Sequence, residues 1–410
     1  MSTPFFKDKP IILDHVKSWP DSPDRTIQSA GRDSYADQAV QKALRSDPKT
    51  SFKLSDCDTL LNKYEPFKIG ECTLYEKDPI LALTQFSSSK SCYISDDSFP
   101  PDKWVNQYNG VLRHSRLKEK LKGDNPVMYL NGPNITDANQ SNLGDCGFVS
   151  TTGAISLHPQ GHNLLFSSIY PPVYNPMGVY SMRIIDQEQG KTGYLIVDDD
   201  LPDENYSYMT DNGEFWFFLI EKAFAKLGGG YSNLGGGSEK YYGLASTSNI
   251  SITEEKKEEV WRNNFIPFFQ GEQLTTYQGT GNTTQYLIPN HAYAVIDAAE
   301  WKDIRLVRLH NPWNTVKYNG DFCPGSQKWN DVPQEIQDKA FQNNRFYIQW
   351  EEKNIPTTFW MPYDYYRQDI PKISKIYLGN DLPDVLKKIA NPNPIQERGD
   401  NGWEVQPRSH

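Results

Sequence analysis

The residue whose surroundings most suggest chemistry is Cys146, in the segment 140–148. A Gly-Asp turn precedes Cys146 and an apolar run follows it, so the pattern predicts that the cysteine begins a helix. The dipole and the unpaired amides at a helix start stabilise a thiolate, the nucleophilic form of cysteine, and can lower its pKa. The alternative is that Cys146 is simply a small buried apolar residue, as most cysteines are. This segment alone leaves both interpretations open.

A histidine and an asparagine far downstream can supply the groups that a nucleophilic thiol needs. His291 stands at the start of an expected strand, where its side chain can face a cleft and act as a base. Asn311 can accept a hydrogen bond from the other ring N–H and fix the tautomer, while Trp313 keeps water away from that bond. Gln140 can donate to a developing oxyanion beside the backbone N–H of Cys146. The order Cys, His, Asn is typical of the papain-type arrangement.

These segments resemble the calpain family of cysteine proteases. The family's blocks LGDC, HAY and NPW have their counterparts in 140–148, 290–295 and 309–314. Further blocks follow in family order, namely Ser98–Pro101, Val197–Pro202, Glu214–Trp216, Leu219–Lys226 and Phe359–Met361. The resemblance covers residues from about 93 to about 380 and is far more specific than a single motif. It implies peptide-bond hydrolysis through an acyl-enzyme, with Cys146, His291, Asn311 and Gln140 as catalytic residues and Trp313 in support.

The resemblance also implies an α+β fold, a papain-like protease core of two lobes. We expect a helical lobe over residues 93–237, which bears Cys146, and a β-rich lobe over 238–384, which bears His291 and Asn311. The apolar pattern and the glycines that follow it predict a largely buried helix over Glu214–Leu227. Strands are predicted over Gly193–Val197, Tyr286–Ile288, Ala292–Ile296, Ile304–Leu309 and Arg345–Trp350. Residues 1–92 and 385–410 are polar and are predicted to be irregular N- and C-terminal extensions.

The resemblance implies that calcium could bind, although the hydrolytic reaction itself requires no cofactor. In the first lobe the family's ligands correspond to the carbonyls of Leu130 and Gly132 and the carboxylates of Asp137 and Glu214. Oxygen atoms of these kinds are the ligands that Ca²⁺ prefers. In the second lobe the family's acidic positions correspond to Lys317, Pro324, Pro356 and Thr358, so that site is expected to be lost. The resemblance therefore implies at most one calcium ion, in the first lobe.

Four positions depart from the family's pattern. Gly147 replaces a bulky Trp after the nucleophile and removes an aromatic wall of the cleft. Asn290 and Asn314 stand where the family has Gly, and Ile135 stands where it has an Arg that couples the lobes. None of them is a reacting group, but a misplacement of about 1 Å can cost on the order of 100-fold in rate. A second hypothesis therefore stays open, a catalytically weak or inactive calpain-like protein that serves as a structural or interaction module in an assembly such as the cytoskeleton.

The composition excludes several other classes of protein. The 410 residues carry a net charge of −10, which opposes nonspecific binding to nucleic acid or to an anionic membrane. No apolar stretch reaches the roughly 18–20 residues that a membrane span needs, and Met1–Pro10 lacks the apolar region of a signal peptide. The five cysteines are scattered and lack CxxC spacing, which argues against a zinc site. We expect a cytoplasmic protein, or one associated with the cytoskeleton, that acts on polypeptides.

The two extensions predict a protein partner. Fixing the backbone of one residue costs roughly 1–2 kcal/mol, and polar termini bury little surface in return. The termini are therefore expected either to wrap the two lobes or to lie along a partner, and their length favours the partner. The aromatic residues available as anchors are Phe5, Phe6, Trp19 and Trp403.

Overall fold

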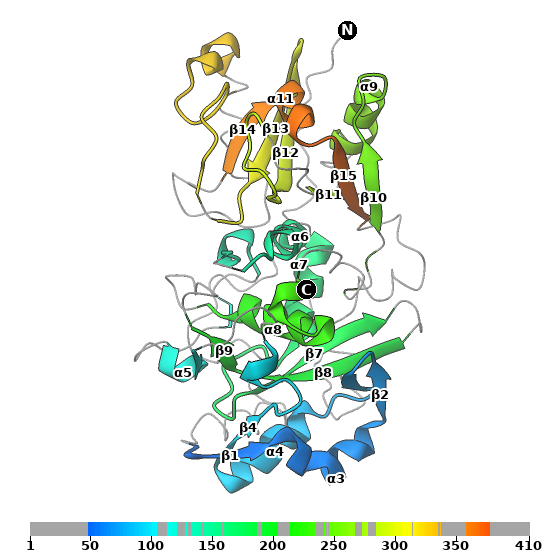
Figure 1. Ribbon diagram of the computed structural model, residues 1–410, viewed down its shortest axis with the longest axis vertical. Coiled ribbons are helices and arrows are strands. Elements are labelled where there is room, and N and C mark those ends of the chain that lie inside the picture. Colours follow the sequence, from blue (N-terminus) through cyan, green and yellow to red (C-terminus); the bar gives the residue numbers. More distant parts are fainter. Residues whose placement is uncertain are drawn as a thin grey trace, which may run out of the picture.

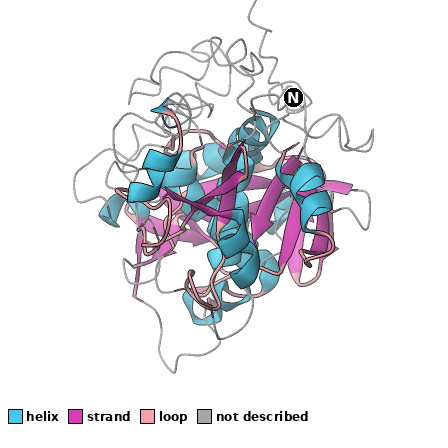
Figure 2. Ribbon diagram, turned by 90° about the horizontal axis from the view of Figure 1, so that it is seen from above, coloured by secondary structure: helices cyan, strands magenta, loops and turns pink. Residues whose placement is uncertain are grey.

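The computed structural model shows two lobes, with α6 (Cys146–Ser156) and α7 (Pro159–Ser168) at the level where the lobes meet (Figure 1). Helices and strands run through the whole body (Figure 2), which confirms the expected α+β class. The structure describes residues 48–104, 113–120, 128–129, 133–140, 143–157, 159–186, 191–203, 214–234, 242, 244, 246–266, 273–277, 284–313, 315–334, 337 and 358–377.

A five-stranded antiparallel sheet forms the centre of the first lobe, with the strand order β2-β3-β8-β7-β6. Its strands are β2 (Pro66–Ile69), β3 (Cys72–Tyr75), β6 (Ile169–Tyr170), β7 (Val179–Asp186) and β8 (Lys191–Asp198). The predicted strand Gly193–Val197 lies inside β8 and is buried throughout. The lobe is thus less helical than expected, because short buried strands such as β3 and β6 carry too few residues to show a period.

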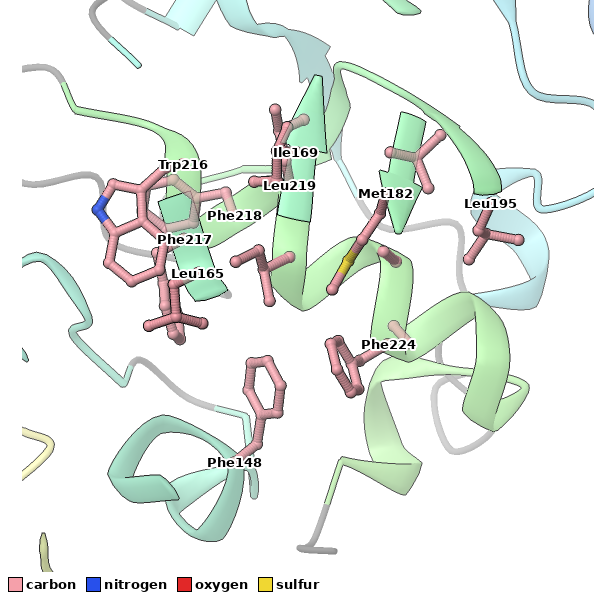
Figure 3. Close-up of a cluster of buried hydrophobic side chains, with 14 of the residues drawn as sticks. Phe148, Leu165, Ile169, Met182, Leu195, Trp216, Phe217, Phe218, Leu219 and Phe224 are labelled. Carbon is pink, nitrogen blue, oxygen red and sulfur yellow. The ribbon is translucent and has the colours of Figure 1, made fainter. Parts of the chain in front are cut away.

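The helices α7 (Pro159–Ser168) and α8 (Trp216–Gly228) pack with this sheet, and α6 (Cys146–Ser156) packs against α7. The predicted buried helix is confirmed as α8, whose residues 216–226 are all buried. It ends at Gly229, whose φ of +76° is a conformation that glycine adopts without strain. Phe148 of α6 points toward the aromatic side chains of α8 (Figure 3), and its ring lies 5.7 Å from that of Phe217 and 5.2 Å from that of Phe224. This contact fixes the nucleophile's helix on the first lobe.

The chain before the first lobe is not irregular over its described part, and this corrects the expectation for residues 1–92. It contains β1 (Thr50–Lys53), α3 (Asp58–Leu61), α4 (Ile80–Lys90), β4 (Cys92–Ser95) and the short turns η2 (Leu54–Cys57) and η3 (Asn62–Tyr64). The hairpin β2–β3 joins the main sheet through β8. Leu61 and Leu83 complete a small core with Val179. Apart from the 11-residue helix α4, each element is only a turn or a few residues long, so no sustained period marks these elements in the sequence. Phe5, Phe6, Trp19 and Trp403 lie outside the described residues.

Short elements connect the main ones, and buried ion pairs hold them. These elements are η4 (Pro101–Lys103), β5 (His114–Arg116), α5 (Leu117–Lys120), η5 (Ile135–Asp137), β9 (Asp200–Pro202) and η6 (Tyr231–Asn233). The acidic turn after β8 is tied to α8 because Asp198 pairs with Lys222. Asp199 pairs with Arg116 at 2.6 Å. The acidic block 197–202 therefore has a structural role that its charge alone does not reveal.

The second lobe contains a six-stranded antiparallel sheet in the order β10-β15-β11-β12-β13-β14. Its strands are β10 (Ser246–Ser251), β11 (Gln273–Tyr277), β12 (Ala294–Trp301), β13 (Ile304–His310), β14 (Thr358–Pro362) and β15 (Lys372–Tyr377). Alongside it lie α9 (Lys257–Val260), the π-helical turn Trp261–Phe265, η10 (Gln327–Asp331) and α11 (Tyr363–Asp369). The strands predicted over 292–296 and 304–309 correspond to β12 and β13.

The strand predicted over Tyr286–Ile288 is wrong. The carboxylate of Asp369 accepts hydrogen bonds from the backbone N–H groups of Gln285, Tyr286 and Leu287 at 2.8, 2.7 and 2.7 Å. A carboxylate that caps three successive amides holds them in a bend, so they are not available to a strand partner. The strand predicted over Arg345–Trp350 lies outside the described residues.

Candidate active site

Cys146 is the first residue of α6, as its position after the Gly-Asp turn predicts. The carbonyl of Asp145 accepts the N–H of Val149 at 3.0 Å, which closes the first turn of the helix. The Cys146 side chain is partly exposed, whereas Cys57, Cys72 and Cys92 are buried. The thiol therefore lies at a helix start and can be reached from solvent.

Helix α6 carries Cys146 onto the second lobe. The cysteine packs against the apolar cluster of that lobe, which includes Ala292, Tyr293 and Val295, and α6 contacts both β11 and β12. The backbone N–H of Ala292 is close enough to the sulfur to favour its thiolate form. Because Ala292 directly follows His291, the fold brings the candidate nucleophile next to the segment that carries the candidate base.

His291 and Asn311 form a complete hydrogen-bonded unit. The distance from Nε2 of His291 to Oδ1 of Asn311 is 2.8 Å. Asn311 Oδ1 also accepts the backbone N–H of Trp313 at 3.1 Å, and its Nδ2 donates to the carbonyl of Thr315 at 2.7 Å. These bonds fix the orientation of the amide, so Nε2 must carry the proton and Nδ1 is the nitrogen that can accept one. Both side chains are buried.

Trp313 covers this unit. Its ring lies 4.2 Å from the imidazole of His291, tilted by 36°. Trp313 is 36% exposed, and it is the one large hydrophobic side chain that is exposed among the residues the structure describes. The indole therefore separates the imidazole from solvent while its own outer surface stays accessible.

Asn290 stands in a left-handed conformation, with φ at +51°. Glycine adopts this conformation without strain, and asparagine tolerates it better than most other residues. The departure from the family's glycine at this position therefore keeps the backbone that sets the direction of His291. Asn314, the other such departure, lies outside the described residues.

The ionisation of the pair differs from the expectation of a lowered thiol pKa. Burial raises the pKa of the Cys146 thiol, and the amides of Ala292, Gly147 and Cys146 oppose this effect without overcoming it. Burial likewise lowers the pKa of His291, against the hydrogen bond with Asn311 that raises it. Both directions favour a neutral thiol and a neutral imidazole at rest, so the thiol must lose its proton as it reacts.

Gln140 is held in place but directed away from an oxyanion role. Its backbone N–H donates to the carbonyl of Pro312 at 2.8 Å, a direct bond between the two lobes. Its side-chain Nε2 donates to the carbonyl of Leu143 at 2.6 Å, and the amide also faces Asp145. The side chain thus points into its own loop, and an oxyanion role requires it to turn.

The two remaining departures both adjoin α6. Gly147 is its second residue and is half-buried. Ile135 is fully buried, and a Cβ atom placed on Gly153 of α6 would lie 2.6 Å from Cγ1 of Ile135. The residue that replaces the family's coupling Arg therefore packs directly into the nucleophile's helix, and position 153 must stay small.

Asp137 and Glu214, the carboxylates predicted to bind calcium, lie side by side and are buried. One oxygen of Asp137 accepts the indole N–H of Trp216 at 2.8 Å and the backbone N–H of Asn134 at 2.9 Å. Burial and the neighbouring Glu214 raise the pKa of Asp137 well above its usual range. Two such carboxylates fit a divalent cation in charge and in donor type. Leu130 and Gly132 lie outside the described residues, within which no group of three or more His, Cys, Asp or Glu is arranged to hold a metal.

The corresponding described positions in the second lobe, Lys317, Pro324 and Thr358, offer a cation no carboxylate. Lys317 and Pro324 are exposed, and Thr358 accepts two hydrogen bonds from the guanidinium of Arg308, from Nε at 3.2 Å and from Nη2 at 3.0 Å. A guanidinium in this place opposes a second positive charge. Pro356 lies outside the described residues.

Comparison with known proteins identifies the family. A model described as "Calpain family cysteine protease" matches residues 94–372. The chain belongs to the calpain family. Among its relatives, Calpain-7 of Mus musculus is 30% identical over 264 residues, which is 56% of this chain and 32% of the relative. Calpain clp-4 of Caenorhabditis elegans is 29% identical over 292 residues, 63% of this chain and 39% of the relative.

A plant relative, the calpain-type cysteine protease DEK1 of Arabidopsis thaliana, is 25% identical over 300 residues. The match covers 66% of this chain but 13% of that relative. The chain thus spans about a third of the length of the mouse relative, and less of the plant one. None of the helices in the described ranges is long and apolar enough to cross a membrane.

Two residues of the site were not expected to have a role, Asp145 and Glu221. Both lie inside family blocks, the first immediately before the nucleophile and the second on α8. The family blocks could therefore have drawn attention to both residues. The sequence does not show that the two residues lie close together, because this depends on how α8 packs against α6.

Proposed function

We propose that this chain is a calpain-type cysteine endopeptidase. Nδ1 of His291 takes the thiol proton while Sγ of Cys146 bonds to the scissile carbonyl carbon, which gives a tetrahedral oxyanion. As the C–N bond breaks, the imidazolium passes its proton to the departing amine, and a thioester remains. His291 then takes a proton from water, whose oxygen attacks the thioester. The acid product leaves and the proton returns to the sulfur.

The observation that carries this proposal is the hydrogen-bond unit of His291, Asn311 and Trp313 beside the Cys146 helix start. A merely structural histidine would not need an amide whose every polar atom is engaged in fixing one imidazole tautomer. The Ala292 amide at the sulfur favours the negative form that the reaction passes through. Asn311 is a positioning residue in this scheme, and Cys146 and His291 are the reacting groups.

A second function, as a weak or inactive interaction module, is favoured by a different observation. The Gln140 amide donates to Leu143, and the thiol is neutral at rest. While the Gln140 side chain is hydrogen-bonded within its own loop, it cannot stabilise an oxyanion. The reaction is then slow unless a bound substrate reorients that side chain. On this alternative, the chain would serve a cytoskeletal or other assembly, with its termini held by a protein partner.

We further propose that the first lobe binds one calcium ion through Asp137 and Glu214, and that the protein acts in the cytoplasm on polypeptide substrates. When bound, the ion would neutralise the two buried carboxylates, and neither reacting residue would depend on it for a proton. Asp137 lies in η5, which also carries Ile135 against α6. The charge state of the carboxylates can therefore influence the position of the nucleophile's helix.

The test is cleavage of casein by the purified chain, with and without calcium. We expect cleavage by the wild type and its loss in Cys146→Ser. Cys323→Ser is the matched control, since Cys323 is the other partly exposed thiol, and it should cleave normally. Cleavage that persists in Cys146→Ser, or that is absent from the wild type under every calcium condition, would refute the peptidase and leave the interaction module.

A further inference from the structure

A buried carboxyl group lies directly behind the nucleophile. Asp145, the residue before Cys146, is 1% exposed. Neither of its oxygens has a hydrogen-bond partner of normal geometry within the described part of the chain, although the Gln140 amide and the Asp145 backbone N–H lie near enough to favour its ionised form. Its side chain also leaves the start of α6 uncapped, although Asp is among the best N-cap residues. The carboxyl is therefore turned away from the helix and into the protein.

The group that it meets there is a second carboxyl. Glu221 of α8 is 4% exposed and its side chain faces that of Asp145, while the Gln140 amide faces Asp145 as well. The phenol of Tyr231 is the other titratable group close to both acids. The nearest cation along α8, Lys222, is committed to Asp198. No Lys, Arg or His of the described residues acts on either acid.

Two adjacent carboxylates without a cation cannot both be ionised in a buried site. Burial and the charge of Asp145 raise the pKa of Glu221 well above its ordinary value. The pKa of Asp145 is raised to about 6, also by burial. At neutral pH, Glu221 therefore keeps a proton and Asp145 carries the charge. A protonated Glu221 carboxyl offers the oxygens of Asp145 an O–H donor in addition to the nearby Gln140 amide.

We propose that Glu221 is a positioning residue, whose protonated carboxyl donates to Asp145 and so ties α8 to the segment that carries Gln140 and Cys146. The Asp145 backbone begins α6, so a shift of its side chain moves the thiol that follows. The backbone N–H of Gln140 donates to the carbonyl of Pro312 on the other lobe. The loop from Gln140 to Asp145 is therefore held by Pro312 at one end and by Glu221 at the other. The role rests on the proposed peptidase function, but the carboxyl pair itself can be measured without turnover.

The experiment compares the wild type with Glu221→Gln and Glu221→Leu. Gln keeps an N–H donor at every pH, whereas Leu has similar size and no donor. We expect kcat of Glu221→Gln to stay within about fivefold of the wild type. We expect kcat of Glu221→Leu to fall by at least about 30-fold, with KM changed by less than about threefold, because a misplaced nucleophile slows chemistry more than binding.

The second readout is the thermal midpoint of unfolding against pH. The unfolded chain gives up the Glu221 proton near the ordinary carboxyl pKa, about 4.3, while the folded protein keeps it. The stability due to the protonated pair is therefore present below that pH and is lost as pH rises toward the raised pKa. We expect the wild-type midpoint to fall relative to that of Glu221→Gln across this range. Glu259→Gln, at an exposed position of α9, should follow the wild type.

The outcomes separate the two proposals. A constant difference in midpoint between the wild type and Glu221→Gln at all pH values would overturn the carboxyl pair, even if Glu221→Leu fails to fold. Equal losses of kcat in Gln and Leu would overturn the positioning role. A wild type that cleaves nothing but keeps the pH-dependent difference in midpoint would contradict the peptidase alone and support the pair.

Discussion

The two lobes differ in how completely hydrogen bonds hold their candidate catalytic side chains in a reactive arrangement. On the second lobe, His291, Asn311, Trp313 and Thr315 form a hydrogen-bonded unit that is complete before any substrate arrives. On the first lobe, the Gln140 amide is bonded to its own loop, and the buried Asp145 carboxyl meets a second acid, Glu221. The base is thus preorganised, whereas the nucleophile and its oxyanion donor are held in a resting arrangement.

This difference indicates which lobe would limit the proposed activity. Of the four departures from the family's pattern near the site, Gly147 and Ile135 adjoin α6 on the nucleophile's side, and Asn290 and Asn314 belong to the base's side. On the base's side, Asn290 keeps the backbone conformation that glycine would have given. Substitutions on the two sides should therefore have different consequences, and the following predictions use that contrast.

The largest effect is expected from Asn311→Leu. This change removes the acceptor of His291 and of the Trp313 amide, and it leaves buried polar groups unpaired at a cost of about 1–3 kcal/mol each. We expect kcat/KM to fall by about 10³-fold through loss of the tautomer, together with a lower thermal midpoint. Asn233→Leu, at an exposed position in η6, is the matched control. A loss below about tenfold would show that the base does not depend on its preorganised unit.

Gln140→Ala should have the next largest effect. It tests whether the nucleophile's side of the site rearranges when substrate binds. If substrate turns the amide toward the oxyanion, its removal should lower kcat by about 10²-fold, as for other oxyanion donors. If the amide stays on Leu143, kcat should change by less than about threefold. Steady-state kinetics on a peptide substrate distinguish the two. We expect the larger loss, and the smaller one would place oxyanion stabilisation on the backbone amides alone.

The contrast between the sides also explains how much the sequence could predict. The nucleophile at a helix start, the strands β12 and β13, the helix α8 and the family itself were predictable, because each has a local pattern or an ordered block. The fold of residues 48–92 and the direction of the Gln140 amide were not. The former depends on short strands, of which β3 pairs with β8 far along the chain, and the latter depends on a single rotamer. The bend at Tyr286 was missed because its cause, Asp369, comes more than eighty residues later.

The pH dependence of alkylation tests the neutral resting pair. Because the thiol pKa is raised, the thiolate fraction at pH 7 is small and should increase about tenfold per pH unit until that pKa is reached. The rate at which iodoacetamide alkylates Cys146 should rise accordingly from pH 6 to pH 8. His291, whose pKa is lowered, should stay neutral over this range. A rate that is flat between pH 5 and pH 8 would indicate a preformed thiolate–imidazolium pair instead.

Calcium should produce the smallest effect, a single binding event on the first lobe. Calorimetry should detect at most one ion per chain. Asp137→Asn should abolish that binding, because it removes a charge from the carboxylate pair, whereas Lys317→Ala should leave it unchanged. Two ions of similar affinity would contradict the loss of the second site, where Arg308 holds Thr358.

The most direct test of the central claim is competition between Cys146 and Cys323 for an electrophilic peptide. Both thiols are partly exposed and burial raises the pKa of both, so simple access gives no large preference. After brief labelling of the folded chain, peptide mapping by mass spectrometry would give the two rates. A working site predicts that Cys146 reacts at least about 10²-fold faster, because His291 removes its proton as the bond forms, and that His291→Ala abolishes the preference. Equal labelling of the two cysteines in the folded wild type would contradict the claim that this site is a protease.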